Sequence, residues 1–205
     1  MRNQTKGNTK SAKELDEHYW NERYKEKNTA WDLGEISPPL KAYIDQLSNK
    51  DLRILIPGCG NSYEAEYLLQ KGFTNITLID IALDLVRELE FKFQSNPSIR
   101  IIAGDFFKHK GEYDLILEQT FFCALNPGLR TNYVEAMLNL IPSGGKIAGV
   151  LFNREFEHDG PPFGGTAAEY LTLFEKDFEL KVFESCTNSF IKRADTELFM
   201  VLKKY

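Results

Sequence analysis

Short apolar runs alternate with amphipathic segments along most of the chain. The apolar runs are rich in Ile, Leu and Val and predict strands at 53–57, 76–80, 99–103, 113–119 and 145–152. The amphipathic segments predict helices at 61–70, 83–93, 126–140 and from residue 166 onward. Asn61 with Glu64 is expected to form a capping box at the start of the first of these helices, and Thr166 with Glu169 at the start of the last. Because the strands are apolar almost throughout rather than at alternate positions, we expect a parallel sheet covered by helices on both faces.

The carboxyl-terminal part breaks this alternation. Two β-rich runs, 179–185 and 197–204, follow one another with no helix between them. They pair most simply as an antiparallel hairpin at one edge of the sheet. The prediction is therefore an α/β fold with a doubly wound, Rossmann-like sheet, mostly parallel and ending in an antiparallel hairpin. We expect residues 1–205 to form a single domain.

The residues before the first strand have a different character. Residues 1–11 are polar without periodicity and are expected to be disordered. An amphipathic helix is predicted over 12–25, a loop over 28–36, and a second helix over 38–47 that opens with two prolines.

Composition excludes several classes of protein. Lys and Arg number 25 against 30 Asp and Glu, so the net charge is −5 and nothing global attracts nucleic acid or an anionic membrane. The apolar runs are too short to span a bilayer, and the polar start is unlike a secretory signal. Three dispersed cysteines indicate no disulfide framework, so we expect a cytoplasmic protein. The sequence leaves open whether it is a monomer or a homodimer.

The turn after the first strand, in ILIPGCGNS (54–62), has three possible explanations: a cofactor-holding loop, a metal or redox cysteine, or a sharp bend. Cys59 has no C-x-x-C partner, and His18, His109 and His158 are far apart in the sequence. A metal or redox site needs a closer cluster, so we expect no metal and a small buried cysteine that fills space.

Polar or glycine residues stand at the ends of four predicted strands, where doubly wound sheets bind ligands. Gly58 and Gly60 let the backbone approach a ligand, and Asp80 lies at the distance along the chain expected of a carboxylate that accepts ribose hydroxyls. Asp105 can accept from an adenine amine, and Phe106 can stack on the base. Gln119 ends the fourth strand. Each signal alone is weak, but together they favour a nucleotide cofactor over a plain bend.

The turn lacks the features that hold phosphates. A dinucleotide fingerprint needs a third glycine where this chain has Tyr63, and no G-x-x-x-x-G-K-[ST] run is present. An adenosine without phosphate, as in S-adenosylmethionine, fits better.

Several blocks of sequence, in order, resemble one known family. They are YWNERYKEKNTAWDLG (19–34), ILIPGCG (54–60), LID (78–80), GDFF (104–107), FFCALNP (121–127) and GPPFGG (160–165). Over about residues 17–175 the chain is similar to the thiopurine methyltransferase-like family of class I S-adenosylmethionine-dependent methyltransferases, and most similar to its halide and thiol (thiocyanate) methyltransferase branch. Ile56 stands where an acidic residue often precedes the glycines, a change that the family shares.

The resemblance implies a set of residues that bind S-adenosylmethionine: Trp20, Tyr24, Trp31, Gly58, Asp80, Asp105, Phe106 and Gln119. The three aromatic residues would belong to a lid over the cofactor, residues 12–36, although without the resemblance a helix core is the ordinary explanation for Trp20 and Tyr24. Because few long-range partners are predicted for this segment, we expect it to order on binding. Gln119 differs from the tyrosine usual in the branch and the arginine usual in thiopurine enzymes.

The acceptor pocket is expected at the same sheet edge. GPPFGG is either a rigid turn or a pocket wall with Phe163 pointing inward, and Phe121 and Phe122 are either core or pocket. Gln119 is a further candidate. No residue is identified as a catalytic base, since His158, near this loop, is typical of a solvated surface position.

The function expected from the resemblance is methyl transfer from S-adenosylmethionine to a small soft nucleophile (a thiol, thiocyanate, hydrosulfide or halide), leaving S-adenosylhomocysteine. Two alternatives remain: an enzyme for thiopurine-like or other small acceptors, and a non-catalytic module that binds an adenosyl ligand. Neither a nucleic acid nor a membrane is expected as a partner.

Overall fold

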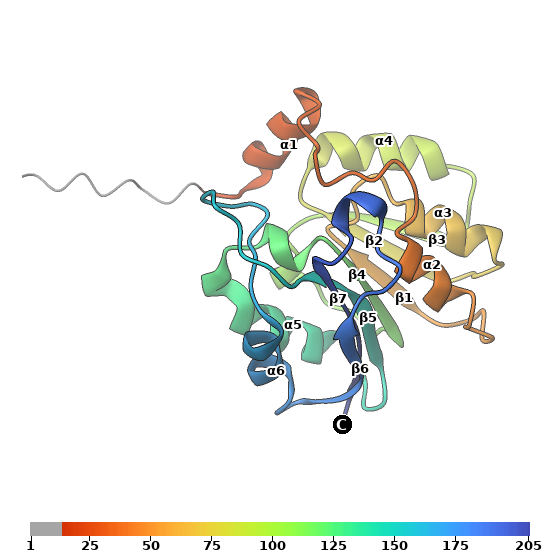
Figure 1. Ribbon diagram of the computed structural model, residues 1–205. Helices are drawn as coiled ribbons and strands as arrows, with labels where there is room; N and C mark the ends of the chain where they lie inside the picture. Colours follow the sequence, from red (N-terminus) through yellow and green to blue (C-terminus); the bar gives the residue numbers. More distant parts are fainter. Residues whose placement is uncertain (1–13) are drawn as a thin grey trace, which may run out of the picture.

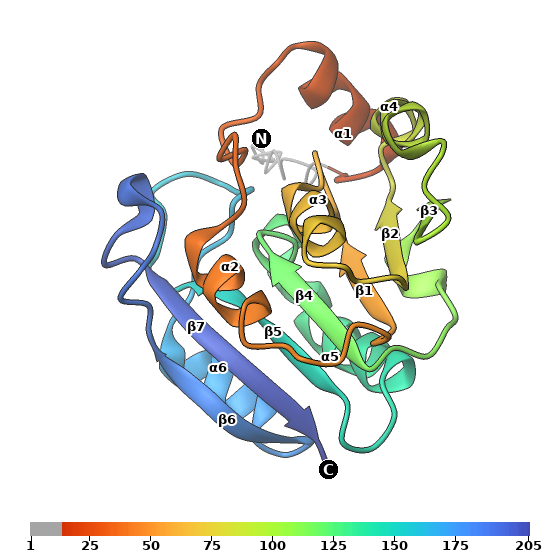
Figure 2. The same ribbon diagram turned by 90° about the vertical axis from the view of Figure 1, so that its right-hand side faces the viewer.

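The computed structural model describes residues 14–205, so the disorder expected for residues 1–11 lies outside the described part. A seven-stranded sheet forms the centre, in the spatial order β3-β2-β1-β4-β5-β7-β6 (Figures 1 and 2). Its strands are β1 (Ile54–Pro57), β2 (Ile76–Asp80), β3 (Ile99–Ala103), β4 (Leu115–Gln119), β5 (Lys146–Phe152), β6 (Phe178–Ser185) and β7 (Glu197–Lys204).

The strand directions confirm the predicted fold class. Strands β1 to β5 are paired in parallel, whereas β7 runs antiparallel to both β5 and β6. The terminal hairpin therefore inserts its second strand next to β5 and leaves β6 at the edge of the sheet. Strand order reverses at the boundary between β1 and β4, which makes their carboxyl ends the switch point of the sheet.

Helices cover both faces of the sheet, as Figure 2 shows. One face carries α2 (Pro38–Ile44), α3 (Tyr63–Gln70) and α4 (Leu83–Phe93), and the other carries α5 (Arg130–Leu140) and α6 (Ala167–Phe174). Each face of the sheet has its own hydrophobic core, and side chains alternate between the two cores within one strand. Ile54 and Ile56 pack in the core under α2, α3 and α4, and Leu55 packs in the core under α5 and α6. The side chains of β1 and β2 are all buried on one face or the other, which is the physical reason for the continuous apolarity of these strands.

Helix α1 (Glu17–Lys25) lies beside α4, away from the sheet (Figure 1). Asp16 caps it by accepting a hydrogen bond from the Tyr19 N–H at 2.9 Å. Residues 28–36 form a loop, as predicted. Helix α2 is shorter than predicted and ends at Ile44 instead of Leu47.

No helix among residues 14–205 is long and apolar enough to cross a membrane.

Two predicted helix starts are placed differently. Asn126-Pro127 opens a short 3-10 turn, Pro127–Leu129, and α5 begins only at Arg130. The predicted capping box of Asn61 and Glu64 is wrong. Helix α3 begins after Ser62, whose side chain does not cap it, while Asn61 donates to Asp32 and Glu64 accepts from the Ser37 N–H. Tertiary partners from the amino-terminal segment engage both side chains. Thr166 and Glu169, by contrast, form the capping box expected at the start of α6.

Candidate functional site

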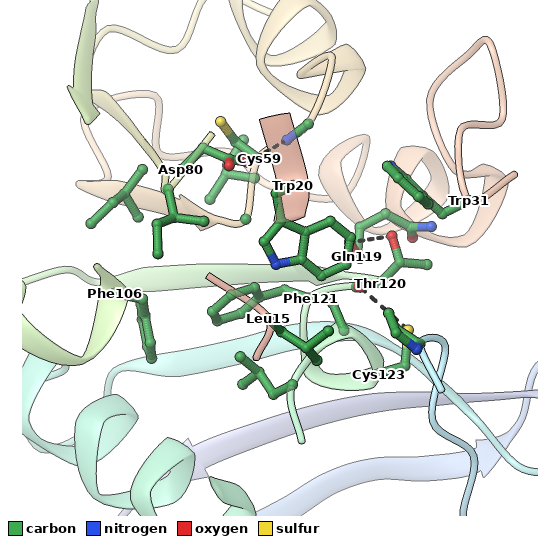
Figure 3. Close-up of a pocket in the computed structure, with 18 of the residues that line it drawn as sticks. Leu15, Trp20, Trp31, Cys59, Asp80, Phe106, Gln119, Thr120, Phe121 and Cys123 are labelled. Carbon is green, nitrogen blue, oxygen red and sulfur yellow. Dashed lines mark hydrogen bonds between the residues drawn. The ribbon is translucent and has the colours of Figure 1, made fainter. Parts of the chain in front are cut away.

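A cavity of about 810 Å³ opens at the carboxyl ends of β1 to β4. Its walls come from the loops that follow these four strands, from the amino-terminal segment and from the loop that contains Pro161 and Pro162. Figure 3 shows residues of several walls pointing into one space, among them Trp20, Asp80, Phe106 and Gln119. The site expected from the strand ends is therefore one continuous cavity at the switch point.

The turn after β1 has an unusual backbone. Gly58 and Gly60 have φ values of +53° and +49°, and Ser62, which precedes α3, has +59°. A Cβ at Gly58 would overlap the ring of Phe121, so this position has no room for a side chain. A Cβ at Gly60 would lie 3.5 Å from the Tyr24 hydroxyl. The glycines thus serve both the turn and the close approach of two aromatic walls.

Asp80, at the end of β2, is buried and holds this turn in place. One carboxylate oxygen accepts from the Gly60 N–H at 3.2 Å and the other from the Ala82 N–H at 2.9 Å. Burial raises the pKa of the carboxyl group, and hydrogen bonds from backbone N–H groups partly oppose that rise. A carboxylate has about four acceptor positions, so Asp80 keeps capacity for ligand hydroxyls in the cavity that it lines.

Asp105 and Phe106 follow β3 and line the same end of the cavity. Asp105 accepts from the Phe107 N–H at 2.9 Å, which starts the 3-10 helix Phe106–Lys108. Phe106 is 5 % exposed and packs edge-on against Phe121, with ring centroids 5.0 Å apart. Both residues therefore line the same cavity as the Asp80 carboxylate.

Three aromatic side chains from the amino-terminal segment cover the cavity. Trp31 packs edge-on against both Trp20 and Tyr24, with centroid distances of 5.5 and 5.7 Å. The three residues line the cavity, and Trp20 and Tyr24 also pack against the core. Burial, with the nearby Asp80 carboxylate, raises the pKa of Tyr24 well above its usual range. Tyr24 therefore stays a neutral phenol and is unsuited to act as a base.

Long-range contacts also hold this segment, which differs from the expectation that it has few partners. The Arg193 side chain, 7 % exposed, donates to the Trp31 carbonyl at 2.6 Å and to Glu197 at 3.3 Å. On α1, the side chain of Asn21 accepts from the Asp84 N–H at 3.0 Å, at the start of α4. No local pattern predicts this contact, since 162 positions separate Arg193 from Trp31.

The expected acceptor-pocket residues separate into two groups. Gln119 and Phe121 line the cavity, together with Leu125, Pro161 and Pro162. Phe122 and Phe163 do not. Phe122 is 1 % exposed and packs edge-on against Tyr133 and Tyr170, so the core explanation holds for it.

In the GPPFGG loop, the two prolines form the wall and Phe163 does not point inward. The ring of Phe163 fills the space beside Gly160, and its backbone N–H donates to the Cys123 carbonyl at 2.7 Å. Arg130 donates to the Gly164 carbonyl at 2.6 Å, so α5 also holds this loop. The loop lies at the predicted edge of the sheet, and its conformation decides which of its side chains line the cavity.

Beneath the cavity lies a buried carboxylate that sequence reasoning missed. Glu118 is fully buried, and one of its oxygens accepts from the N–H groups of Phe121 and Phe122 at 2.8 and 2.9 Å. Its other oxygen accepts from the Tyr133 hydroxyl at 2.8 Å. Burial raises the pKa of Glu118 to about 7 against these hydrogen bonds. The sequence signal for this buried carboxylate is a charged residue within the mostly apolar run LILEQ.

The cysteines behave as space-filling residues. Cys59 is 6 % exposed, as predicted, and burial raises its pKa well above the usual range. Burial likewise raises the pKa of Cys123, another lining residue, to about 12. Within residues 14–205, no group of three or more His, Cys, Asp or Glu side chains could hold a metal ion.

Comparisons with known proteins agree with this geometry. The family model described as thiopurine S-methyltransferase (TPMT) matches residues 15–199. A probable thiol methyltransferase 2 of Arabidopsis thaliana is 29 % identical over 156 residues, covering 74 % of this chain and 69 % of the relative. A thiopurine S-methyltransferase of Acinetobacter baylyi is 25 % identical over 193 residues, covering 82 % and 88 %.

Among solved structures, the 1,6-didemethyltoxoflavin-N1-methyltransferase of Burkholderia thailandensis, crystallised with S-adenosylhomocysteine, is similar in fold. The TM-score is 0.72 at 18 % identity, with 92 % of this chain and 86 % of that chain covered. At this level of identity the likeness concerns the fold alone.

Proposed function

The chain belongs to the thiopurine S-methyltransferase family, and within it we propose that the methyl acceptor is a small soft nucleophile: a thiol, thiocyanate, hydrosulfide or halide. The protein is an S-adenosylmethionine-dependent methyltransferase that acts on small molecules. What remains to be assigned is the acceptor and the residues that hold each reactant. The proposal rests chiefly on the aromatic wall of the cavity near Gln119 and on the similarity to a thiol methyltransferase.

The residues at the strand ends fit S-adenosylmethionine. Asp80 would accept the ribose hydroxyls, Asp105 and Phe106 would hold the adenine, and the bare backbone at Gly58 and Gly60 would admit the methionine part. Trp20, Tyr24 and Trp31 would cover the sulfonium, because aromatic faces attract a cation. Gln119 also supports a bound ligand in this cavity, since its buried side-chain amide has no partner among the described residues.

Methyl transfer would be an in-line displacement. The cofactor supplies an activated methyl group on a positively charged sulfur, and the acceptor's lone pair forms the new bond while the carbon–sulfur bond breaks. The chain would position the acceptor and keep water out of the cavity. Phe121, Leu125 and Pro162 would restrict the approach of the acceptor and exclude water.

No residue is assigned as a base. The phenol of Tyr24 and the thiol of Cys123 hold their protons, and His158 is exposed, stacked on Phe156 with ring centroids 5.4 Å apart.

An acceptor panel tests the proposal directly. Purified protein with S-adenosylmethionine is offered iodide, bromide, thiocyanate, hydrosulfide, small thiols and thiopurines, and methylated products are measured by gas or liquid chromatography. We expect the small soft nucleophiles to give the highest kcat/KM. A panel in which thiopurines are the best substrates contradicts the proposed acceptor class. Absence of product from every acceptor contradicts the proposed function as a whole.

The pH dependence of the rate should follow the acceptor rather than the enzyme. Thiocyanate and iodide are anions throughout, so their rates should be almost flat from about pH 6 to 9, whereas rates with thiols should rise towards the thiol pKa near 8.5. His158→Ala should leave both profiles unchanged, because His158 lies outside the cavity lining. If thiol turnover instead follows an enzyme group near pH 6.5 and is lost in this variant, a dedicated base exists.

The lid should depend on its Arg193 anchor. Arg193→Met removes the hydrogen bonds to the Trp31 carbonyl and to Glu197. We therefore expect faster hydrogen exchange over residues 28–36 and a KM for S-adenosylmethionine raised by about 3- to 30-fold. Lys25→Met, which removes an exposed ion pair with Asp84 at 3.4 Å, should change the KM little. Equal exchange in the wild type and Arg193→Met would show that the lid is held by other contacts.

A further inference from the structure

The cavity wall is negatively charged. Among residues 14–205, its lining includes no lysine, arginine or histidine, although it includes the carboxylates Glu14, Asp16, Asp32, Glu35, Glu64, Asp80 and Asp105. Arg23 and Arg193, which contact Trp31, lie outside the lining. Such a wall attracts a cation and repels an anion. A negatively charged acceptor would therefore meet no positive side chain in the described lining itself.

One neutral donor is available at the wall. Both side-chain polar atoms of Gln119 are buried and have no hydrogen-bond partner in the described part of the chain. The neighbouring Thr120 hydroxyl is already engaged, since it donates to the Gln119 carbonyl at 2.7 Å. Figure 3 shows the Gln119 side chain on the same side of the cavity as Trp31, away from Asp80 and Phe106. Buried amide groups normally have partners, so this one points to a ligand.

We propose that an anionic acceptor is held between the Gln119 amide and the positive sulfonium of the bound cofactor, so that it binds only to the cavity loaded with S-adenosylmethionine. The inference rests on the proposed function, whose reactants it places in order. The cofactor supplies a positive charge that the side chains of the described lining lack. After transfer, the sulfur of S-adenosylhomocysteine is neutral, and a second anion no longer has its partner. Binding is therefore ordered, and anions bind the product complex poorly.

Calorimetric titration with thiocyanate tests this order on the full chain in three states. These are the free protein, the complex with S-adenosylhomocysteine, and the complex with sinefungin, a cofactor analogue with a positively charged amine in place of the methylated sulfur. We expect the sinefungin complex to bind thiocyanate at least about ten-fold more tightly than the other two states, because a pair of opposite charges out of water attracts strongly. Equal affinity in the S-adenosylhomocysteine complex overturns the proposal.

Variants of Gln119 test the other partner. Gln119→Met preserves the size and removes the donor, so thiocyanate affinity in the sinefungin complex should fall by about 10- to 150-fold, the loss of a hydrogen bond to an anion. Gln119→Arg supplies the missing cation, so thiocyanate should then bind the S-adenosylhomocysteine complex as well. Gln94→Arg, the same change at an exposed position outside the lining, is the matched control and should bind like the wild type. Unchanged thiocyanate affinity in Gln119→Met removes the amide from the proposal.

This test is separate from that of the proposed function. If the panel yields methylated products while thiocyanate binds all three states equally, the charge argument fails and the function stands. If no acceptor is methylated, the function fails whatever thiocyanate does.

Discussion

Replacing Asp80 by alanine is expected to weaken the binding of S-adenosylmethionine by about 1–3 kcal/mol, or roughly 5- to 150-fold, because charge-assisted hydrogen bonds to the ribose are lost. The same change removes the acceptor of the Gly60 N–H, so the turn after β1 should loosen too. Calorimetry with S-adenosylhomocysteine and with S-adenosylmethionine measures the effect.

Two further variants separate the causes. Asp80→Asn keeps an acceptor oxygen for the backbone and removes the charge, so it should have an intermediate affinity. Asp51→Ala removes an exposed carboxylate that is not part of the cavity and should bind like the wild type. A folded Asp80→Ala protein with unchanged affinity would falsify the placement of the ribose at this residue.

Replacing Glu118 by alanine should lower the free energy of unfolding by about 2–4 kcal/mol. The change leaves the N–H groups of Phe121 and Phe122 and the Tyr133 hydroxyl without their acceptor, and each unpaired buried donor costs about 1–3 kcal/mol, partly offset by relief of the carboxylate's own burial. Urea denaturation measures this loss. The kcat for any accepted nucleophile should fall as well, since Phe121 would lose the contact that fixes it at the cavity wall.

Glu118→Gln gives the matched comparison, because an amide of the same shape keeps both backbone donors and can donate to Tyr133. The pKa of Glu118 in the folded protein is about 7, raised by burial, against about 4.3 in an unfolded chain. Between these values the folded state keeps a proton that the unfolded state releases. This contribution to stability is complete below about pH 4.3 and is lost as the pH rises through 7.

The unfolding free energy of the wild type, relative to Glu118→Gln, should therefore fall by up to about 3 kcal/mol between pH 4.5 and 8. Parallel stability curves for the two proteins over this range would show that Glu118 does not change its protonation there.

Strand and helix periodicity explain why so much of the fold could be predicted. The runs at 76–80 and 99–103 and the helix at 83–93 have the boundaries that their patterns indicate. Each is apolar or amphipathic over its own length, so local sequence carries the information. The antiparallel hairpin at the sheet edge also followed from local evidence, since no helix separates its strands.

The sequence by itself determined the fold class, the edge of the sheet that holds the cavity, and the glycine and carboxylate residues at the strand ends. These follow from short-range periodicity and from the rule that ligands bind at the carboxyl ends of parallel strands. Only the tertiary structure decided which side chains face the cavity. It buried Phe122, turned Phe163 away and joined Arg193 to Trp31, and it left the Gln119 side chain without a partner among residues 14–205. Contacts between residues distant in sequence depend on how loops pack, and no local pattern encodes them.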